Sequence, residues 1–171
     1  MITSPPERDA ERWGAVPTIA LATLIAGVLD ITSAFVIWGL RGVGPIRGLQ
    51  RIATGLLGQD SFNRGLTSAG LGLAVHFLIV LVAASLFYAA SRKLRFLTDQ
   101  AVVSGLAYGV AVYLFMTCVV LPLAAIKPPH TVPEVMRSMI IVMLLVGLPV
   151  ALIVRRYSGS QPSTLNAQTL Q

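Results

Sequence analysis

The chain has 171 residues, of which 55% are hydrophobic and 12% are charged, and its mean hydropathy is +0.77. A soluble domain carries about 25% charged residues, so this composition excludes one and predicts an all-α membrane protein. The net charge of +6 is expected of basic residues that flank membrane spans. It therefore predicts contact with membrane lipids through their anionic headgroups and no nucleic-acid partner.

Four apolar runs are predicted to form transmembrane helices, at residues 18–38, 66–90, 101–125 and 138–154. A membrane helix needs about 20 apolar residues, so the short fourth run is expected to extend back into the 133–137 turn. The sequence predicts one four-helix domain at 17–157. It also predicts a cytoplasmic N-terminal tail at 1–16 and a disordered polar tail at 158–171.

The positions of Lys and Arg indicate the orientation, because cytoplasmic loops hold an excess of these residues. The two tails and the loop after the second run carry seven of them, and the other side carries six. The clusters at 92–95 and 155–156 directly adjoin apolar runs, where this rule is strongest. We therefore expect both termini to lie in the cytoplasm.

A separate amphipathic helix is predicted at 45–58, between the first two membrane helices. Pro45 suits a helix start, and apolar residues from Ile46 to Leu57 fall on one helical face while Arg47 and Arg51 fall on the other. A helix of this length cannot cross a bilayer. It is expected to lie in the membrane interface with both arginines toward lipid phosphates, or to dock over the bundle as a cover.

Asp30 is the only formally charged residue in the four apolar runs. A charged side chain at the centre of a membrane helix costs roughly 2.5–3.5 kcal/mol on insertion scales, so such residues face a partner, a cavity or a proton path. His76 falls at the same depth in the second run, because both residues lie about 3 Å from the midplane on the same side. Both follow stripes of small residues, where membrane helices approach closely. We expect both side chains to point into the bundle and to form a hydrogen-bonded pair.

The third run adds two polar residues, Tyr113 at its midpoint and Thr117 about 6 Å further toward the same side. Asp30, His76, Tyr113 and Thr117 are therefore predicted to form one polar cluster. The fourth run supplies no polar residue at 139–154. This absence counts against a transport path, which should draw polar residues from several helices.

Glycine and proline positions predict how the last two helices pack. Gly105 and Gly109 have the spacing of a close helix contact, either within the chain or across a dimer. Gly147 and Pro149 predict a kink in the fourth helix. Cys118 is the sole cysteine, which excludes an intrachain disulfide, and we expect it to be a small core residue.

Two chemistries suit an aspartate and a histidine at this depth. The pair can share one proton, which is the composition of a proton relay. Alternatively, Asp30 stays protonated and simply joins two helices, with His76 as its partner. The sequence contains no ligand set or nucleophile arrangement that indicates an enzyme, a metal site or a cofactor. Haem would require His76 from two protomers, because the other histidine, His130, lies in a turn.

The stretch AGVLDITSAFVIWGLRG at 26–42, with GLLGQDSF at 55–62 and VGLPVAL at 146–152, resembles uncharacterised bacterial inner-membrane proteins of four helices. The resemblance covers residues 18–156. The chain is also similar to the YagU type of inner-membrane protein. This resemblance implies a location in the bacterial inner membrane, and the family brings no established activity or site residues.

Two function classes follow from these patterns. In the first, the protein is a structural or accessory membrane protein, and the buried Asp30–His76 pair stabilises the bundle next to a membrane-protein partner. In the second, it is a small proton-linked transporter or channel in which Asp30 binds a proton or a cation. The second class predicts a homodimer, because four helices enclose little space. The missing polar residues at 139–154 favour the first class.

Overall fold

A computed structural model of the chain describes residues 14–123 and 131–157. Four helices in this part are long and apolar enough to cross a membrane: Ala15–Leu40, Gly65–Lys93, Ala101–Val120 and Val132–Tyr157, here called the first to fourth spans. The prediction of an all-α membrane protein with four membrane helices is confirmed. The fourth span begins six residues before the predicted run, since its first turn contains Pro133, a residue that suits a helix start.

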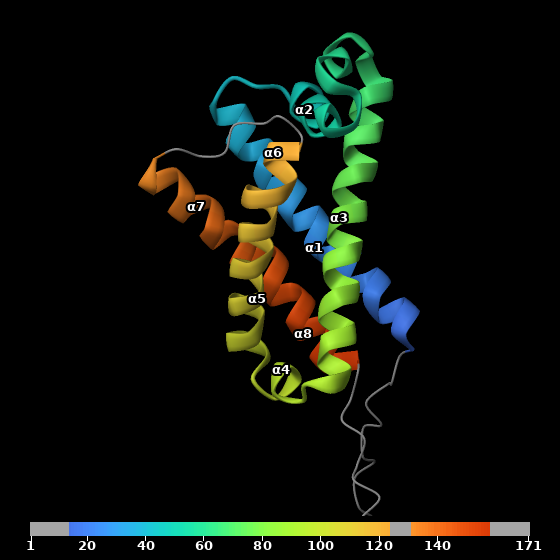
Figure 1. Cartoon of the computed structure of the whole chain (residues 1–171), viewed down its shortest axis with the longest axis vertical. Coiled ribbons are helices and arrows are strands. Elements are labelled where there is room, and N and C mark those ends of the chain that lie inside the picture. Colours follow the sequence, from blue (N-terminus) through green and yellow to red (C-terminus); the bar gives the residue numbers. More distant parts are fainter. Residues whose placement is uncertain (1–13, 124–130, 158–171) are drawn as a thin grey trace, which may run out of the picture.

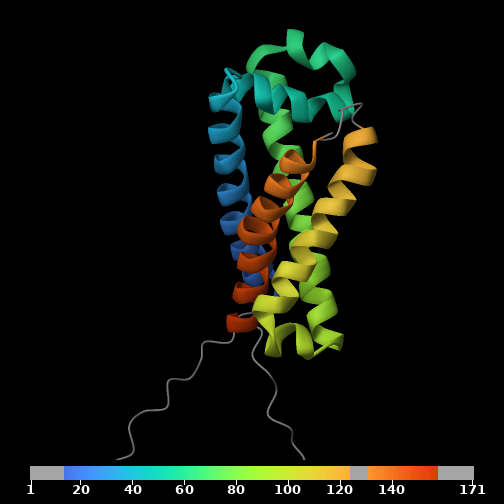
Figure 2. The ribbon, with the colours of Figure 1, turned by 90° about the vertical axis from the view of Figure 1, so that its left-hand side faces the viewer.

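The four spans run up and down beside one another (Figures 1 and 2). The first is α1 (Ala15–Leu40) and the second is α3 (Gly65–Lys93). The third comprises α5 (Ala101–Phe115) and a π-helical turn (Met116–Val120), followed by α6 (Leu121–Leu123). The fourth comprises α7 (Val132–Val142), a π-helical turn (Met143–Gly147) and α8 (Leu148–Tyr157). The start of α1, the end of α8 and the short α4 (Phe96–Asp99) lie at one end of the bundle.

The amphipathic helix forms as predicted and is α2 (Pro45–Leu57), followed by the 3-10 helix Gly58–Asn63. It lies across the end of the bundle opposite α4 (Figure 1). Gly72 of α3 has no side chain, so the α2 backbone at Leu49 and Ala53 can pack directly against it. The Trp38 ring of α1 covers Gly48 in the same way. The helix is therefore docked over the end of the bundle.

In the half of the bundle away from α2, the helices are held together by contacts between small residues. A side-chain carbon at Gly105 would lie 2.8 Å from the Cβ of Ala151, and one at Gly109 would collide with the backbone of Met143. This glycine spacing therefore mediates a contact between the third and fourth spans of one chain. Nearby, the core is filled by buried side chains from all four spans, among them Ala26, Phe87, Ala101 and Val150.

Proline interrupts both of the last two spans. The π-helical turn at Met116–Val120 precedes Pro122, and the one at Met143–Gly147 precedes Pro149. Proline lacks an N–H to donate to the carbonyl four residues before it, so the helix changes its hydrogen bonding there. In the fourth span this interruption stands where the sequence predicted a kink. Cys118, in the first of these turns, is exposed, so its assignment as a core residue was wrong.

Candidate functional site

A cavity of about 250 Å³ lies in the half of the bundle that α2 covers. Its wall is mostly apolar, and five polar side chains reach it: Asp30, His76, Tyr113, Thr117 and Ser138. They come from all four spans. The four residues predicted to form a polar cluster thus line one cavity, together with a fifth that the sequence did not single out.

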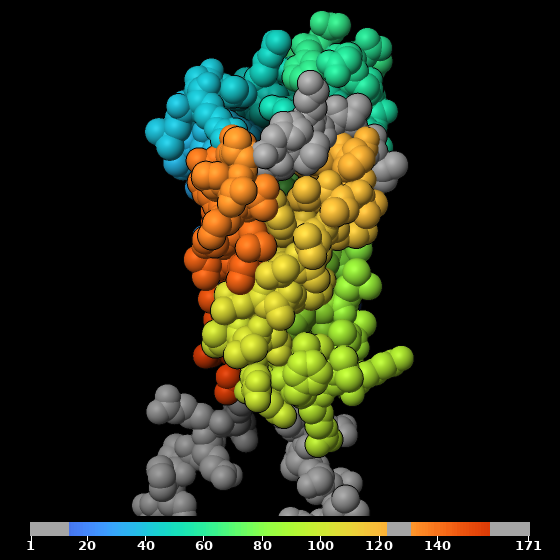
Figure 3. All heavy atoms as spheres, turned by 60° about the vertical axis from the view of Figure 1, so that its left-hand side comes forward, coloured from blue at the N-terminus to red at the C-terminus, as the bar shows by residue number. Residues whose placement is uncertain are grey.

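The cavity exists because the third and fourth spans separate toward the α2 end. The glycine contacts hold them together below, at Gly105 and Gly109. Beyond the two π-helical turns, α7 and the end of the third span diverge, as the space-filling view also shows (Figure 3). Met116 and Thr117 of one turn and Val146 of the other line the cavity. Interrupted helices of this kind are frequent at functional sites.

Asp30 lies on α1 and is partly buried rather than fully enclosed. It is close enough to His76 for the charges of the two side chains to interact. Within residues 14–123 and 131–157, however, the carboxylate of Asp30 accepts no hydrogen bond. The expected hydrogen bond between Asp30 and His76 is therefore absent from the described chain, and the two side chains interact through charge alone.

His76 instead makes its hydrogen bond to a backbone carbonyl. Its Nε2–H donates to the carbonyl oxygen of Gly27, at 3.1 Å, and so links α3 to α1. Because a carbonyl oxygen only accepts, Nε2 carries the proton and Nδ1 of a neutral ring is left as an acceptor. Gly27 also allows the helices to approach, since a side-chain carbon there would lie 2.5 Å from the Phe77 ring. The sequence pattern did not indicate Gly27 as the partner of His76, and its one signal is its place about one turn before Asp30.

Tyr113 is 6% exposed, and its hydroxyl has no hydrogen-bond partner among the described residues. The hydroxyl of Tyr108 on the same helix shows the contrast, because it donates to the carbonyl of Ala83 on α3 at 2.7 Å. A buried hydroxyl without a partner costs about 1–3 kcal/mol in folding free energy. Because Tyr113 also lines the cavity, a ligand that enters it and shifts this side chain slightly can supply the missing partner.

Ser138 changes the argument drawn from the fourth helix. The expected absence of polar residues was stated for 139–154 and passed over Ser138, the first residue of the predicted run. Ser138 lies inside the fourth span and lines the cavity. With this residue, polar groups come from every span, and the observation that favoured an accessory role is removed.

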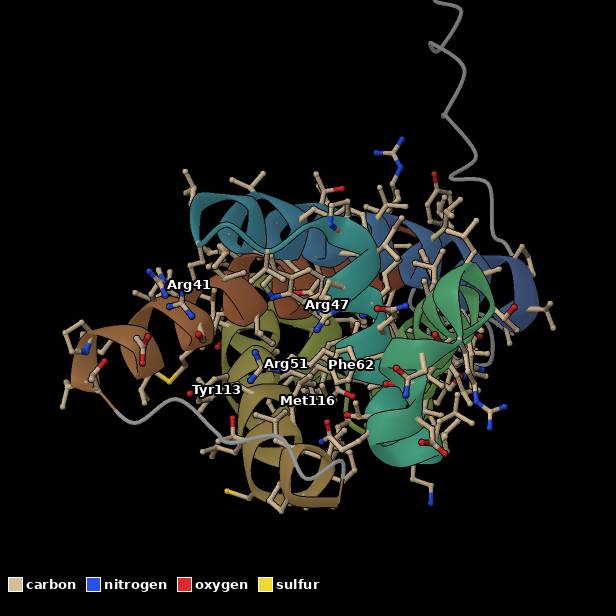
Figure 4. The ribbon with its side chains drawn as sticks, turned by 90° about the horizontal axis from the view of Figure 1, so that it is seen from above. Arg41, Arg47, Arg51, Phe62, Tyr113 and Met116 are labelled. Carbon is tan, nitrogen blue, oxygen red and sulfur yellow. The ribbon has the colours of Figure 1, made fainter. Side chains whose placement is uncertain are left out.

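The cavity is covered on one side by α2, whose Ile52 lines it. Gln50 fixes this helix by donating from Nε2 to the carbonyl of Gly65 at 2.9 Å. Arg47 and Arg51 are exposed and extend from α2 across the end of the bundle toward α5 (Figure 4). The guanidinium carbon of Arg47 lies 5.0 Å from the centre of the Phe62 ring. In the described residues, the only ion pair joins Arg41 and Glu134 at 2.9 Å.

Within the described ranges, no group of three or more His, Cys, Asp or Glu residues is arranged to hold a metal ion. Comparisons with protein-family models, curated proteins and solved structures found no match. The fold and the site together define a multi-pass membrane protein whose helix bundle holds a mostly apolar cavity with a polar side chain from each span.

Proposed function

We propose that the protein is a small proton-linked transporter in which Asp30 alternately holds a proton and a cation. The observation that carries this proposal is the cavity, to which every span contributes a polar side chain. An ionisable residue that lines a cavity within a membrane bundle is where a proton path or a cation site is expected. Asp30 is the one formally charged residue of that wall.

The alternative, a structural or accessory protein, would need these polar groups to hold the helices together. His76 does so through Gly27. The Tyr113 hydroxyl does not, since it has no hydrogen-bond partner within the described chain, and Asp30 interacts with His76 through charge rather than through a hydrogen bond of the described chain. Groups that stabilise a bundle are expected to be paired, because an unpaired polar group in a bundle is costly. Groups that bind a solute are expected to be available, and this difference favours transport.

The glycine contacts suggest how the site reaches the two faces of the membrane. The cavity lies toward α2, and close packing at Gly105 and Gly109 closes the opposite half. Alternating access requires a second state in which this packing loosens and the separated ends of α5 and α7 come together. The two π-helical turns lie between these halves and are the proposed hinges. One chain forms the whole cavity, so the proposal does not depend on a homodimer.

Asp30→Asn in purified protein reconstituted into vesicles tests this function. Asn keeps the shape of the side chain but cannot release a proton. Proton release is measured with a pH dye while a panel of cations is added, and Asp60→Asn, in the exposed 3-10 helix, is the matched control. We expect proton release from the wild type and the control, and none from Asp30→Asn. Absence of proton release from the wild type across the panel would refute the transporter.

Anionic lipids are the proposed partners of α2. Arg47 and Arg51 are one helical turn apart and exposed, and neither forms an ion pair among the described residues. Each such residue near a membrane surface contributes about 1 kcal/mol of attraction to anionic headgroups. Unfolding in phosphatidylglycerol and phosphatidylcholine bilayers compares the wild type with Arg47→Gln/Arg51→Gln. A phosphatidylglycerol effect that survives in the double variant would contradict this assignment.

We also propose a location in the bacterial inner membrane with both termini in the cytoplasm, in keeping with the resemblance to four-helix inner-membrane proteins. Gln59 and Thr98 lie near opposite ends of the bundle, in the 3-10 helix and α4, and Gln59 is exposed whereas Ser61 of the same helix is fully buried. Single cysteines at 59 and 98, in a Cys118→Ser background, should label only from outside at 59 and only from inside at 98. The reverse pattern would invert the orientation.

A further inference from the structure

We infer that the ligand of this cavity is a small protonated amine with a mainly apolar body. The inference rests on the proposed function, because it names the cation that exchanges with the proton at Asp30. Three features of the cavity lead to it: the sign of its charge, the chemistry of its polar atoms, and its size.

The charge of the wall selects a monocation. Asp30 is the only Asp, Glu, Lys or Arg among the lining residues. The wall holds no Lys or Arg, and its one basic side chain is the imidazole of His76, which leaves an ionised Asp30 uncompensated when the ring is neutral. A single cationic group would then complete an ion pair in a site of low dielectric, where an unpaired charge is strongly disfavoured. An anion would meet the like charge of Asp30.

The polar atoms of the cavity wall are mainly hydrogen-bond acceptors, so they favour a ligand that donates hydrogen bonds. The Asp30 carboxylate only accepts when ionised, and Nδ1 of a neutral His76 ring is left as an acceptor because Nε2 donates to Gly27. Tyr113 lines the cavity, and its buried hydroxyl has no partner among the described residues. An ammonium group carries N–H donors for these acceptors, whereas a quaternary ammonium group carries none.

The size and the walls describe the rest of the ligand. The volume of about 250 Å³ is below the ~300–1,000 Å³ of pockets that take drug-sized molecules. Apart from the polar residues, the wall consists of aliphatic side chains and one thioether, for example Ile79, Val112 and Met116. A compact hydrocarbon or single aromatic ring fits such a wall. Benzylamine combines this body with one ammonium group and is a suitable probe.

The test is isothermal titration of the purified full-length chain in detergent at pH 7 with four matched probes: benzylamine, benzyl alcohol, benzoate and benzyltrimethylammonium. We expect benzylamine to bind at least about tenfold more tightly than the other three, the ratio expected from one charge-assisted hydrogen bond. Asp30→Asn should weaken benzylamine by at least about tenfold, and Tyr113→Phe by a smaller factor. Tyr88→Phe, which lies outside the cavity wall, should leave the affinity unchanged.

Circular dichroism and thermal unfolding of each variant show whether it is folded, and Tyr113→Phe keeps the test valid if Asp30→Asn fails to fold. Equal binding of benzyl alcohol or benzoate would overturn the amine assignment, as would a folded wild type that binds no probe. Equal binding of benzyltrimethylammonium would overturn the role of N–H donors. Proton release on addition of metal cations without amine binding would leave the transporter standing and refute the amine. Amine binding without proton release would refute the proton-linked transporter and leave the amine site standing.

Discussion

Tyr108 and Tyr113 lie on the same helix, five residues apart, and the structure gives their hydroxyl groups opposite roles. The Tyr108 hydroxyl donates to the carbonyl of Ala83 at 2.7 Å and joins α5 to α3. The Tyr113 hydroxyl is buried at the cavity wall with no partner among the described residues. Replacing each by phenylalanine removes one oxygen atom and leaves the ring in place. The two variants should therefore change the free energy of unfolding in different directions.

The expected size follows from the contacts of each residue. Tyr108→Phe loses one hydrogen bond between helices, worth on average about 0.6 kcal/mol and at most about 1.7 kcal/mol in membrane proteins. Its ring keeps its contact with Phe87, at 5.0 Å between ring centres. Tyr113→Phe loses no bond and removes a buried hydroxyl whose lack of a partner costs about 1–3 kcal/mol. We expect the first variant to be less stable than the wild type by about 1 kcal/mol, and the second to be equally stable or slightly more stable.

The assay is equilibrium unfolding in mixed micelles, followed by circular dichroism under identical detergent conditions. Benzylamine affinity measured on the same samples gives the second half of the prediction. Tyr108→Phe should bind normally once folded, whereas Tyr113→Phe should bind more weakly despite its stability. Equal destabilisation by the two variants would refute the claim that the Tyr113 hydroxyl is unpaired and reserved for a ligand.

Three further predictions concern the packing around the cavity. Gly109→Ala should lower the free energy of unfolding by about 1–3 kcal/mol, since its new side chain would collide with the Met143 backbone. The control Gly70→Ala should leave this free energy unchanged, because a side-chain carbon at Gly70 meets nothing within 4 Å. Equal losses for the two variants in mixed-micelle unfolding would contradict this packing. Gln50→Leu removes the hydrogen bond that fixes α2 to the start of α3, so amide hydrogen exchange should become faster in α2 and stay unchanged in the middle of α3. Unaltered exchange in α2 would show that this hydrogen bond is not needed to hold the helix in place. Glu134→Gln breaks an exposed ion pair and should not change the thermal unfolding temperature measurably, whereas a clear drop would mean that the pair holds the fourth span in place.

The sequence predicted the spans and α2 because these features depend on local patterns. Run length and hydropathy specify a membrane helix, and the alternation of apolar and basic residues specifies an amphipathic one. The depth of a residue along a span follows from counting. For this reason Asp30, His76, Tyr113 and Thr117 could be assigned to one level of the bundle, where they line the same cavity.

The predictions made from the sequence were wrong where a side chain's partner or exposure depends on how the helices rotate and separate. The expected bond between Asp30 and His76 gave way to one from His76 to Gly27, because the face that a side chain presents is set by packing between α1 and α3. Cys118 was assigned to the core and is exposed. Ser138 was left out although it begins the predicted fourth run, because its place at the edge of the apolar stretch does not show that it lines a cavity.

By itself, then, the sequence determined an all-α membrane protein and the depth of its polar residues, because hydropathy and helical rise act along the chain. The tertiary structure decided that the third and fourth spans meet at Gly105 and Gly109 and separate beyond their π-helical turns. It also decided that α2 covers the space they leave. That space is produced by contacts between residues far apart in sequence, and no local pattern of residues encodes it.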